Sequence, residues 1–292
     1  MAFDLPRLNL TDRATWPTRR DEEWKYSDLS RALGDGVDNP QQTHDRLSLA
    51  AGATQTRFEV IETPGAAFSE LEITLAEGAS LTRVLVLDTP AEAITLQRVT
   101  VVTAPGSVFR QIVVSTGARF QRIETHVLHA GHGALVELNG AYLLGGQTHC
   151  DLTTRVQHIA PDGITRQLTR GLVRDRATGV FQGRILVDQG ADGTDAQMQH
   201  QALILSDGAR VRAKPELEIY ADDVQCAHGN TIGALDEAAL FFCQARGMPE
   251  PLARAVLTQA FVLPVAETLA DESLRNRLLA WIETRTEAFH GL

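Results

Sequence analysis

A cysteine and a histidine lie two residues apart in the segment YADDVQCAHGNTIGALDE, which runs from Tyr220 to Glu237. Side chains of an extended strand alternate between its two faces, so Cys226 and His228 would share one face with Cα atoms roughly 7 Å apart. Thiolates and imidazoles are both good ligands for zinc and for the iron of clusters. The pair therefore has the residue types and the spacing of half a metal site.

The other half of such a site is not evident in this segment. A closed zinc site takes four protein ligands, and iron–sulfur clusters are usually held by four thiolates or by thiolates mixed with imidazoles. The segment adds only the carboxylates of Asp222 and Asp223, which are harder ligands. Three hypotheses stay open: the missing ligands come from elsewhere in the fold, they come from another chain, or the pair packs as ordinary side chains without metal.

Two further groups have suitable residue types but less favourable spacing. His126, His129 and His132 would align on a helix, but the surrounding residues are typical of strand and turn, where His129 faces away from the other two. His149 and Cys150 are adjacent, so they lie on opposite faces of a strand. A cysteine–histidine hydrolase also needs an orienting residue and an oxyanion hole, which the sequence does not identify. We expect these side chains to be packed or solvated.

Short segments rich in Val, Ile, Leu and Thr predict a mainly β core. We expect strands to start near Ser69, Ser80, Thr95, Ser107, Arg119, Ala134, Thr148, Ile164, Thr178, Asp195 and Arg210. Several turns share a glycine and a small residue before a strand that carries arginine, as in EGASLTR, APGSVFR and SDGARVR. A repeated unit of one strand and one turn favours a β-solenoid, with a β-sandwich as the alternative.

Helical patterns flank the β core and divide the chain into three regions. The segment from Thr18 to Leu33 has acidic residues early, arginine late and Trp24 at near-helical spacing with two leucines. We expect an N-terminal helical segment and linker over residues 1–55, a β-helix core over 56–235 and a C-terminal helical domain over 236–292.

The C-terminal region predicts three helices. The first starts at Asp236, a good N-cap, and stops at Gly247, and Pro264 should kink or end the second. The third carries one apolar stripe, made of Leu274, Leu278, Trp281, Ile282 and Phe289. We expect these helices to cover the open edge of the last solenoid strand or to bind a partner.

The composition narrows the function classes. The chain has 292 residues, 43% of them hydrophobic, and a net charge of −10, which disfavours nucleic acid and anionic membranes as partners. The first residues lack the apolar core of an export signal, and no apolar run is long enough to span a bilayer. Three cysteines are too few for a disulfide framework. We expect a cytoplasmic protein that does not hydrolyse nucleotide, since phosphate-binding fingerprints are absent from the sequence.

Two stretches resemble the SufB/SufD family, which assembles iron–sulfur clusters. Residues 183–248, from GRILVDQG to FFCQARGM, resemble the shared core of the family, and RRDEEWKY, residues 19–26, resembles its N-terminal signature. The glycine that follows His228 is similar to the SufD branch, where SufB typically has glutamate. The resemblance implies a right-handed parallel β-helix followed by a small helical domain. Members of the SufD branch commonly have a longer segment before this signature than the 18 residues found here.

The resemblance also implies partners and a site. The helical domain would dock a SufC-like ABC-type ATPase, and the end of the β-helix would pair with a SufB-like paralogue. His228 matches a SufD histidine implicated in cluster assembly at that interface, and Cys226 matches its neighbouring cysteine. The missing ligands would then come from the partner. No tightly bound cofactor is expected in the isolated chain, and iron or a cluster would be held transiently in the complex.

These observations give one leading hypothesis and two alternatives. The first is a non-catalytic scaffold subunit for iron–sulfur cluster assembly, with His228 and Cys226 as interfacial ligands. The second is a homodimeric β-helix interaction scaffold without metal, since an open solenoid edge permits self-pairing. The third is a β-helix hydrolase, which would need paired carboxylates along a groove that the turns do not provide.

Overall fold

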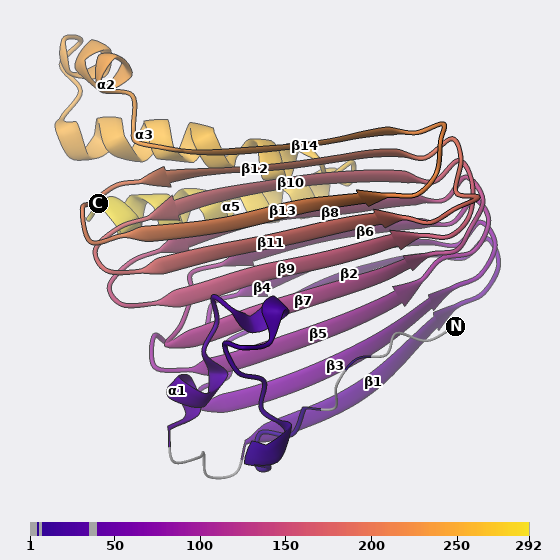
Figure 1. The fold of residues 1–292 in the computed structure, drawn as a ribbon. Helices are drawn as coiled ribbons and strands as arrows, with labels where there is room; N and C mark the ends of the chain where they lie inside the picture. The colour runs from indigo at the N-terminus through magenta and orange to yellow at the C-terminus, as the bar shows by residue number, and fades with distance from the viewer. Residues whose placement is uncertain (1–4, 6–7, 35–39, 292) are drawn as a thin grey trace.

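The computed structural model describes residue 5, residues 8–34 and residues 40–291, and its centre is a β-solenoid (Figure 1). Successive strands alternate between two parallel sheets of seven strands, with the order β1-β3-β5-β7-β9-β11-β13 in sheet A and β14-β12-β10-β8-β6-β4-β2 in sheet B. The bounds are β1 Gln41–Leu49, β2 Thr54–Ile61, β3 Ala66–Leu75, β4 Ser80–Leu87, β5 Ile94–Val102, β6 Val108–Ser115, β7 Phe120–His129, β8 Leu135–Leu144, β9 His149–His158, β10 Ile164–Val173, β11 Thr178–Val187, β12 Asp195–Ile204, β13 Arg210–Ile219 and β14 Gln225–Gly233. The predicted solenoid is confirmed, because each ladder between these strands is parallel, unlike those of a sandwich.

The turns between strands use residues that tolerate a left-handed backbone. Gly78 and Gly106, from two turns of the predicted signature, have φ of 64° and 63°. Asp162 and Asp175 adopt φ of 56° and 58° in later turns. Glycine avoids the steric cost of positive φ, and aspartate tolerates it better than most residues. The recurrent turn composition therefore determines where each strand of the solenoid begins. One coil of the solenoid is one strand from each sheet with the turns that join them.

The strand starts agree closely with the sequence prediction, and the largest difference is at β3, expected at Ser69 and observed at Ala66. The solenoid starts earlier than the predicted core of residues 56–235, because β1 begins at Gln41 and β2 at Thr54. Both strands pair with the following coil and so belong to the two sheets. The predicted N-terminal segment and linker also include residues 1–4, 6–7 and 35–39, which lie outside the described residues.

The N-terminal segment lies against the outer face of sheet A. The predicted N-terminal helical segment is confirmed as short helical pieces: the chain forms a 3₁₀ turn, Glu22–Trp24, and a short helix, α1 Leu29–Leu33, after an earlier 3₁₀ turn at Arg13–Thr15. These pieces do not join into one helix where side chains dock on the sheet. The ring of Trp24 lies 4.0 Å from the Arg122 guanidinium, and the Ser27 hydroxyl donates to Asp151. Tertiary contacts therefore override the local helical pattern.

The C-terminal helices cover the outer face of sheet B. Their bounds are α2 Glu237–Gln244, α3 Glu250–Val262, α4 Pro264–Glu267 and α5 Glu272–His290. Asp236 caps α2 by accepting from two backbone N–H groups, as expected. The apolar stripe of α5, with Leu278 and Ile282 fully buried, packs on the outward side chains of sheet B, including Ile112. Among the helices of the described residues, none is long and apolar enough to cross a membrane.

The prediction that these helices could cap the last strand needs correction. Helices α3 to α5 lie along the sheet, and α2 projects past the β14 end of the stack without covering it (Figure 1). The stripe of α5 is complementary to a sheet face, which offers far more apolar area than a strand edge. Within the described part of the chain, these helices leave the edge of β14 uncovered.

Candidate functional site

The site candidates lie on β14, the edge strand of sheet B at the C-terminal end of the solenoid. This strand pairs with β12 on one side, and its other edge is free of a strand partner among the described residues. Its sequence, QCAHGNTIG, contains no Lys, Arg, Asp or Glu. An uncharged open edge is a template for pairing with another chain.

The pleat of β14 places Cys226 and His228 on one face, as predicted. They lie opposite Ala196 and Met198 of β12, both of which are buried in the solenoid interior. Cys226 is half-buried and packs against that interior core, whereas His228 is exposed. Both side chains therefore lie on the inner face of β14, at the C-terminal end of the solenoid interior. The imidazole is more accessible to solvent than the thiol.

The space around His228 is polar. A shallow groove of about 240 Å³ runs along β12 and β14 and is lined by His228. Its other lining residues are Gln197, Met198, Gln199, Gln201, Ala227, Gly229 and Thr231. The sulfur of Met198 occupies space that Gly183 leaves free, since a Cβ at Gly183 would lie 2.1 Å from it. A methionine thereby fits beneath the imidazole.

The two candidate ligands differ in how easily they can bind metal. Burial raises the pKa of the Cys226 thiol, and the nearby Asp195 carboxylate raises it further. The thiolate is the metal-binding form, so this environment opposes metal binding by Cys226 alone. His228 is exposed, so its imidazole is accessible to a ligand.

No complete metal site forms within the part of the chain that the structure describes. No group of three His, Cys, Asp or Glu side chains among these residues could hold an ion. Asp222 and Asp223 are exposed in the turn before β14 and do not complete a set with Cys226 and His228. The first of the three hypotheses, ligands supplied from elsewhere in the fold, therefore gains no support from the described residues.

The other histidine groups are dispersed, as expected. His126 is buried on the outer face of sheet A beneath the N-terminal segment, and His129 lies inside the solenoid, stacked on His158 with ring centroids 4.3 Å apart. His132 is exposed in a turn and pairs with Asp162 at 2.9 Å. These imidazoles do not converge on one point.

His149 and Cys150 also face opposite ways. Cys150 is fully buried in the interior core, and burial raises the pKa of its thiol to about 12. His149 lies on the outer face, where it stacks on Phe120 and its Nε2 lies 3.0 Å from the Ser27 hydroxyl. A cysteine so deeply buried and protonated is not a nucleophile.

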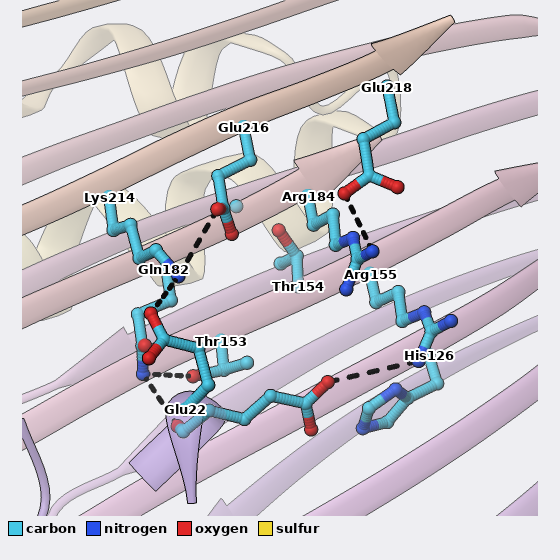
Figure 2. A pocket seen from close by; sticks show the side chains of 12 residues that line it. Glu22, His126, Thr153, Thr154, Arg155, Gln182, Arg184, Lys214, Glu216 and Glu218 are labelled. Carbon is cyan, nitrogen blue, oxygen red and sulfur yellow. Dashed lines mark hydrogen bonds and ion pairs between the residues drawn. The ribbon is translucent and has the colours of Figure 1, made fainter. Parts of the chain in front are cut away.

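A second pocket, of about 350 Å³, lies on the outer face of sheet A where the N-terminal segment meets β11 and β13 (Figure 2). Lys214 contacts Glu22 at 2.6 Å and Glu216 at 3.1 Å, and Arg184 contacts Glu218 at 2.7 Å. These cations are already neutralised by carboxylates. The pocket therefore joins the N-terminal segment to the last coils and is a weaker candidate for a ligand site than the β14 edge.

Residues 34–261 match the family model described as "SUF system FeS cluster assembly, SufBD core domain". The chain belongs to the SufBD family. The match begins just before β1 and ends within α3, so it includes the whole solenoid and the β14 edge. The family resemblance stated from the sequence is confirmed.

Two of three similar curated relatives carry an iron–sulfur cluster assembly assignment in their names. Iron-sulfur cluster assembly protein SufD of Escherichia coli is 35% identical over 169 residues, which cover 58% of this chain and 40% of that protein. A SufBD family protein of Synechocystis is 34% identical over 61% of this chain and 39% of its own length. Protein ABCI7, chloroplastic, of Arabidopsis thaliana is 34% identical over 59% of this chain and 36% of its own length. The matched part of the SufBD-family chain thus corresponds to well under half of each of these relatives.

One residue near the predicted pair was missed at the sequence level. Asn230 follows His228 at the same two-residue spacing, so the alternation that linked Cys226 to His228 also places Asn230 on their face. Its side chain contacts the buried His200 of β12, with 2.7 Å between Oδ1 and Nδ1. The spacing was visible in the SufBD-family sequence, but the contact depends on the register of two strands.

Proposed function

We propose that this chain is a non-catalytic scaffold subunit of an iron–sulfur cluster assembly complex. In this proposal the open C-terminal end of the solenoid pairs with a SufB-like chain, and His228 is one ligand of an iron or cluster site shared across the interface. Cys226 is a second ligand or a helper. The observation that carries the proposal is the exposed imidazole of His228 on an uncharged, open edge strand.

The inner face of the last coil supports pairing with another chain. On β13, Val211 and Leu217 are only partly buried although they pack on the interior core. On β14, Ile232 is 40% exposed. A partner with a matching solenoid end would bury this apolar surface and satisfy the free backbone groups of β14. The incomplete ligand set at Cys226 and His228 would be completed in the same step.

The two edge strands at this end are not equivalent. Strand β13, RVRAKPELEI, carries alternating charges and Pro215, which has no N–H to donate to a ladder. Charges and proline both discourage edge pairing, whereas β14 has neither. We therefore assign the pairing edge to β14.

Helix α2 supports the second part of the proposal, the docking of a SufC-like ATPase. Phe241 and Phe242 are 71% and 54% exposed on this helix, which projects from the solenoid. Adjacent exposed aromatic residues are costly in water and are typical of protein-binding surfaces. The ATPase would supply the nucleotide chemistry for which this sequence has no fingerprint.

The test is anaerobic reconstitution of this chain with a SufB-like and a SufC-like partner, read by absorbance and by chemical iron and sulfide content. His228→Ala should leave the fold and the complex intact and reduce cluster content at least tenfold, because an interfacial ligand is lost. His132→Ala, which removes another exposed histidine, is the matched control and should retain the cluster. Normal cluster content in His228→Ala would refute the site assignment.

Self-pairing is the second candidate, because an uncharged edge accepts a second copy when the partner is absent. Light scattering of the purified chain with and without the SufB-like partner separates the two. A dimer that dissociates on addition of the partner supports the scaffold proposal, and a dimer that persists supports the homodimeric alternative. The hydrolase alternative gains no support from the pocket of Figure 2, whose carboxylates are engaged with cations. The cytoplasmic location stays a prediction.

A further inference from the structure

Three hydrogen-bonded polar side chains connect the interior of the solenoid to the β14 edge. The Tyr142 hydroxyl lies 2.8 Å from His200 Nε2, and His200 Nδ1 lies 2.7 Å from Asn230 Oδ1. Tyr142 and His200 are fully buried, whereas Asn230 is exposed. The last of these side chains, Asn230, therefore lies on the same face of β14 as His228, two residues further along the strand.

The interior is shaped to hold these side chains in place. Gly171 and Gly179 leave a slot for the Tyr142 ring, since a Cβ at either glycine would lie 2.2 Å or 2.6 Å from ring atoms. Phe181 stacks on the His200 ring at 4.8 Å with an interplanar angle of 4°. Neither ring can rotate without displacing its neighbours.

The available donors and acceptors determine which atom donates the proton in each of these two hydrogen bonds. Among the described residues, His200 is the hydrogen-bond partner of the Tyr142 hydroxyl, so the buried O–H must donate to Nε2 to avoid losing its bond. Burial lowers the pKa of His200 to about 4, so the imidazole is neutral and carries one proton. That proton is then on Nδ1 and is donated to Asn230 Oδ1.

The amide of Asn230 is consequently oriented. With Oδ1 bound to His200, the amide nitrogen with its two N–H groups is directed away from that contact. Sulfur atoms of clusters and thiolates accept N–H hydrogen bonds, which adjust cluster potential and stability. On an extended strand Asn230 is roughly 7 Å from His228, within reach of the far side of a ligand bound there.

We propose that Asn230 donates an amide N–H to a sulfur atom held beside His228, and that Tyr142 and His200 are positioning residues that fix the amide in this orientation. The inference rests on the proposed function of the open end. It predicts a contact to sulfur rather than a further metal ligand.

The first test needs no cluster. Side-chain ¹⁵N spectra of the histidine-labelled chain, assigned with His200→Gln, should show His200 protonated at Nδ1. In Asn230→Ala the acceptor is lost, and the Nδ1 resonance should shift. Protonation at Nε2 in the wild-type chain would reverse the direction of the relay and overturn the inference.

The second test uses the reconstituted complex. In Asn230→Ala the sulfur-to-iron absorption bands should shift, and chelator-driven loss of the cluster should be about tenfold faster, as for other lost outer contacts. Tyr142→Phe keeps the ring in its slot and should give a smaller acceleration. Thr56→Ala, an exposed position on β2 at the opposite end of the same sheet, should match the wild type.

The outcomes separate the inference from the proposed function. Loss of the cluster in His228→Ala, together with wild-type bands and stability in Asn230→Ala, would overturn the inference alone. A wild-type cluster in both variants would overturn the proposed function.

Discussion

The two ends of the solenoid present different inner faces. At the N-terminal end, the register of β1 and β2 places Asp45 opposite Leu71 and Glu59 opposite Leu85, so carboxylates lie over the interior core. Glu59 is engaged by Arg83 at 2.6 Å, and Arg83 itself is buried. This end cannot pair with an apolar surface without burying charge.

At the C-terminal end, the equivalent positions of β14 are neutral. Cys226, His228 and Ile232 lie over buried residues of β12, and none carries a fixed charge. Inward-pointing charges are a known protection against edge pairing. The difference between the ends supports the proposal that the C-terminal end, and not the N-terminal end, pairs with another chain.

The largest expected effect comes from making the C-terminal end resemble the N-terminal end. Ile232→Asp places a charge where the partner would bury it, and we expect affinity for the SufB-like chain to fall more than 100-fold, since an unpaired buried charge costs several kcal/mol. Titration calorimetry measures the change.

Val60 provides the matched control for this variant. It is 48% exposed on β2, the edge strand of the same sheet at the opposite end. Val60→Asp should leave the affinity unchanged. Equal loss in both variants would mean that the ends do not differ in function.

The next effect separates the solenoid end from helix α2. Phe241→Ser combined with Phe242→Ser should weaken binding of the SufC-like ATPase at least tenfold, because exposed aromatic anchors contribute strongly to interfaces. Binding of the SufB-like chain should not change. Ile159→Ser, at a turn residue that is 36% exposed, is the control. Unaltered ATPase binding in the double variant would place that interface elsewhere.

The third prediction concerns two histidines that are buried in the interior of the solenoid, between its ends. Burial lowers the pKa of His129 to about 4 and of His158 to about 3, from an ordinary value of 6.5. Below pH 6.5 the unfolded chain therefore binds more protons at these two histidines than the folded chain does. Above pH 6.5 both states are unprotonated there, so these groups do not reduce the free energy of unfolding. It should fall by up to about 1.4 kcal/mol per pH unit per histidine as the pH decreases toward 4.

Denaturant unfolding between pH 7.5 and 4.5 measures this dependence. His158→Gln removes one titrating group and should give a shallower slope. Ile159→Ser, a partly exposed neighbour of His158 that carries no titrating group, should leave the slope unchanged. A slope that is the same in His158→Gln and wild type would contradict the assignment.

The smallest effect is expected at Cys226. Its raised thiol pKa makes it a poor thiolate in the isolated chain, so Cys226→Ala should reduce the cluster content of the complex by no more than about threefold. Anaerobic iron and sulfide analysis tests this. A loss as complete as that of His228→Ala would give the two ligands equal roles.

The strands were predictable where local patterns decide. Turn residues such as Gly78 and Gly106 mark the coil boundaries, and the strands between them are rich in β-branched residues. Strand β1 was not predictable, because QQTHDRLSL is mostly polar and is extended through its ladder with β3. The division of the N-terminal segment into 3₁₀ turns and one short helix was not predictable for the same reason, since Trp24 docks on Arg122 in a distant part of the sequence.

The site was predictable in part. Residue type and two-residue spacing identify Cys226 and His228 and place them on one face. Their position on an open edge depends on where the C-terminal helices pack, which the sequence prediction placed partly over that edge. The contact of Asn230 with His200 depends on the register between β14 and β12, which no local spacing encodes.

The most direct test of the shared site is pulsed electron paramagnetic resonance of the reduced cluster, with ¹⁵N-histidine incorporated into this chain alone. Unlabelled partners complete the complex, so any ¹⁵N coupling must come from this protein. The account predicts a directly bound ¹⁵N that is retained in His132→Ala and absent in any residual cluster of His228→Ala. A fully loaded complex without ¹⁵N coupling would contradict the claim that the open end supplies a ligand.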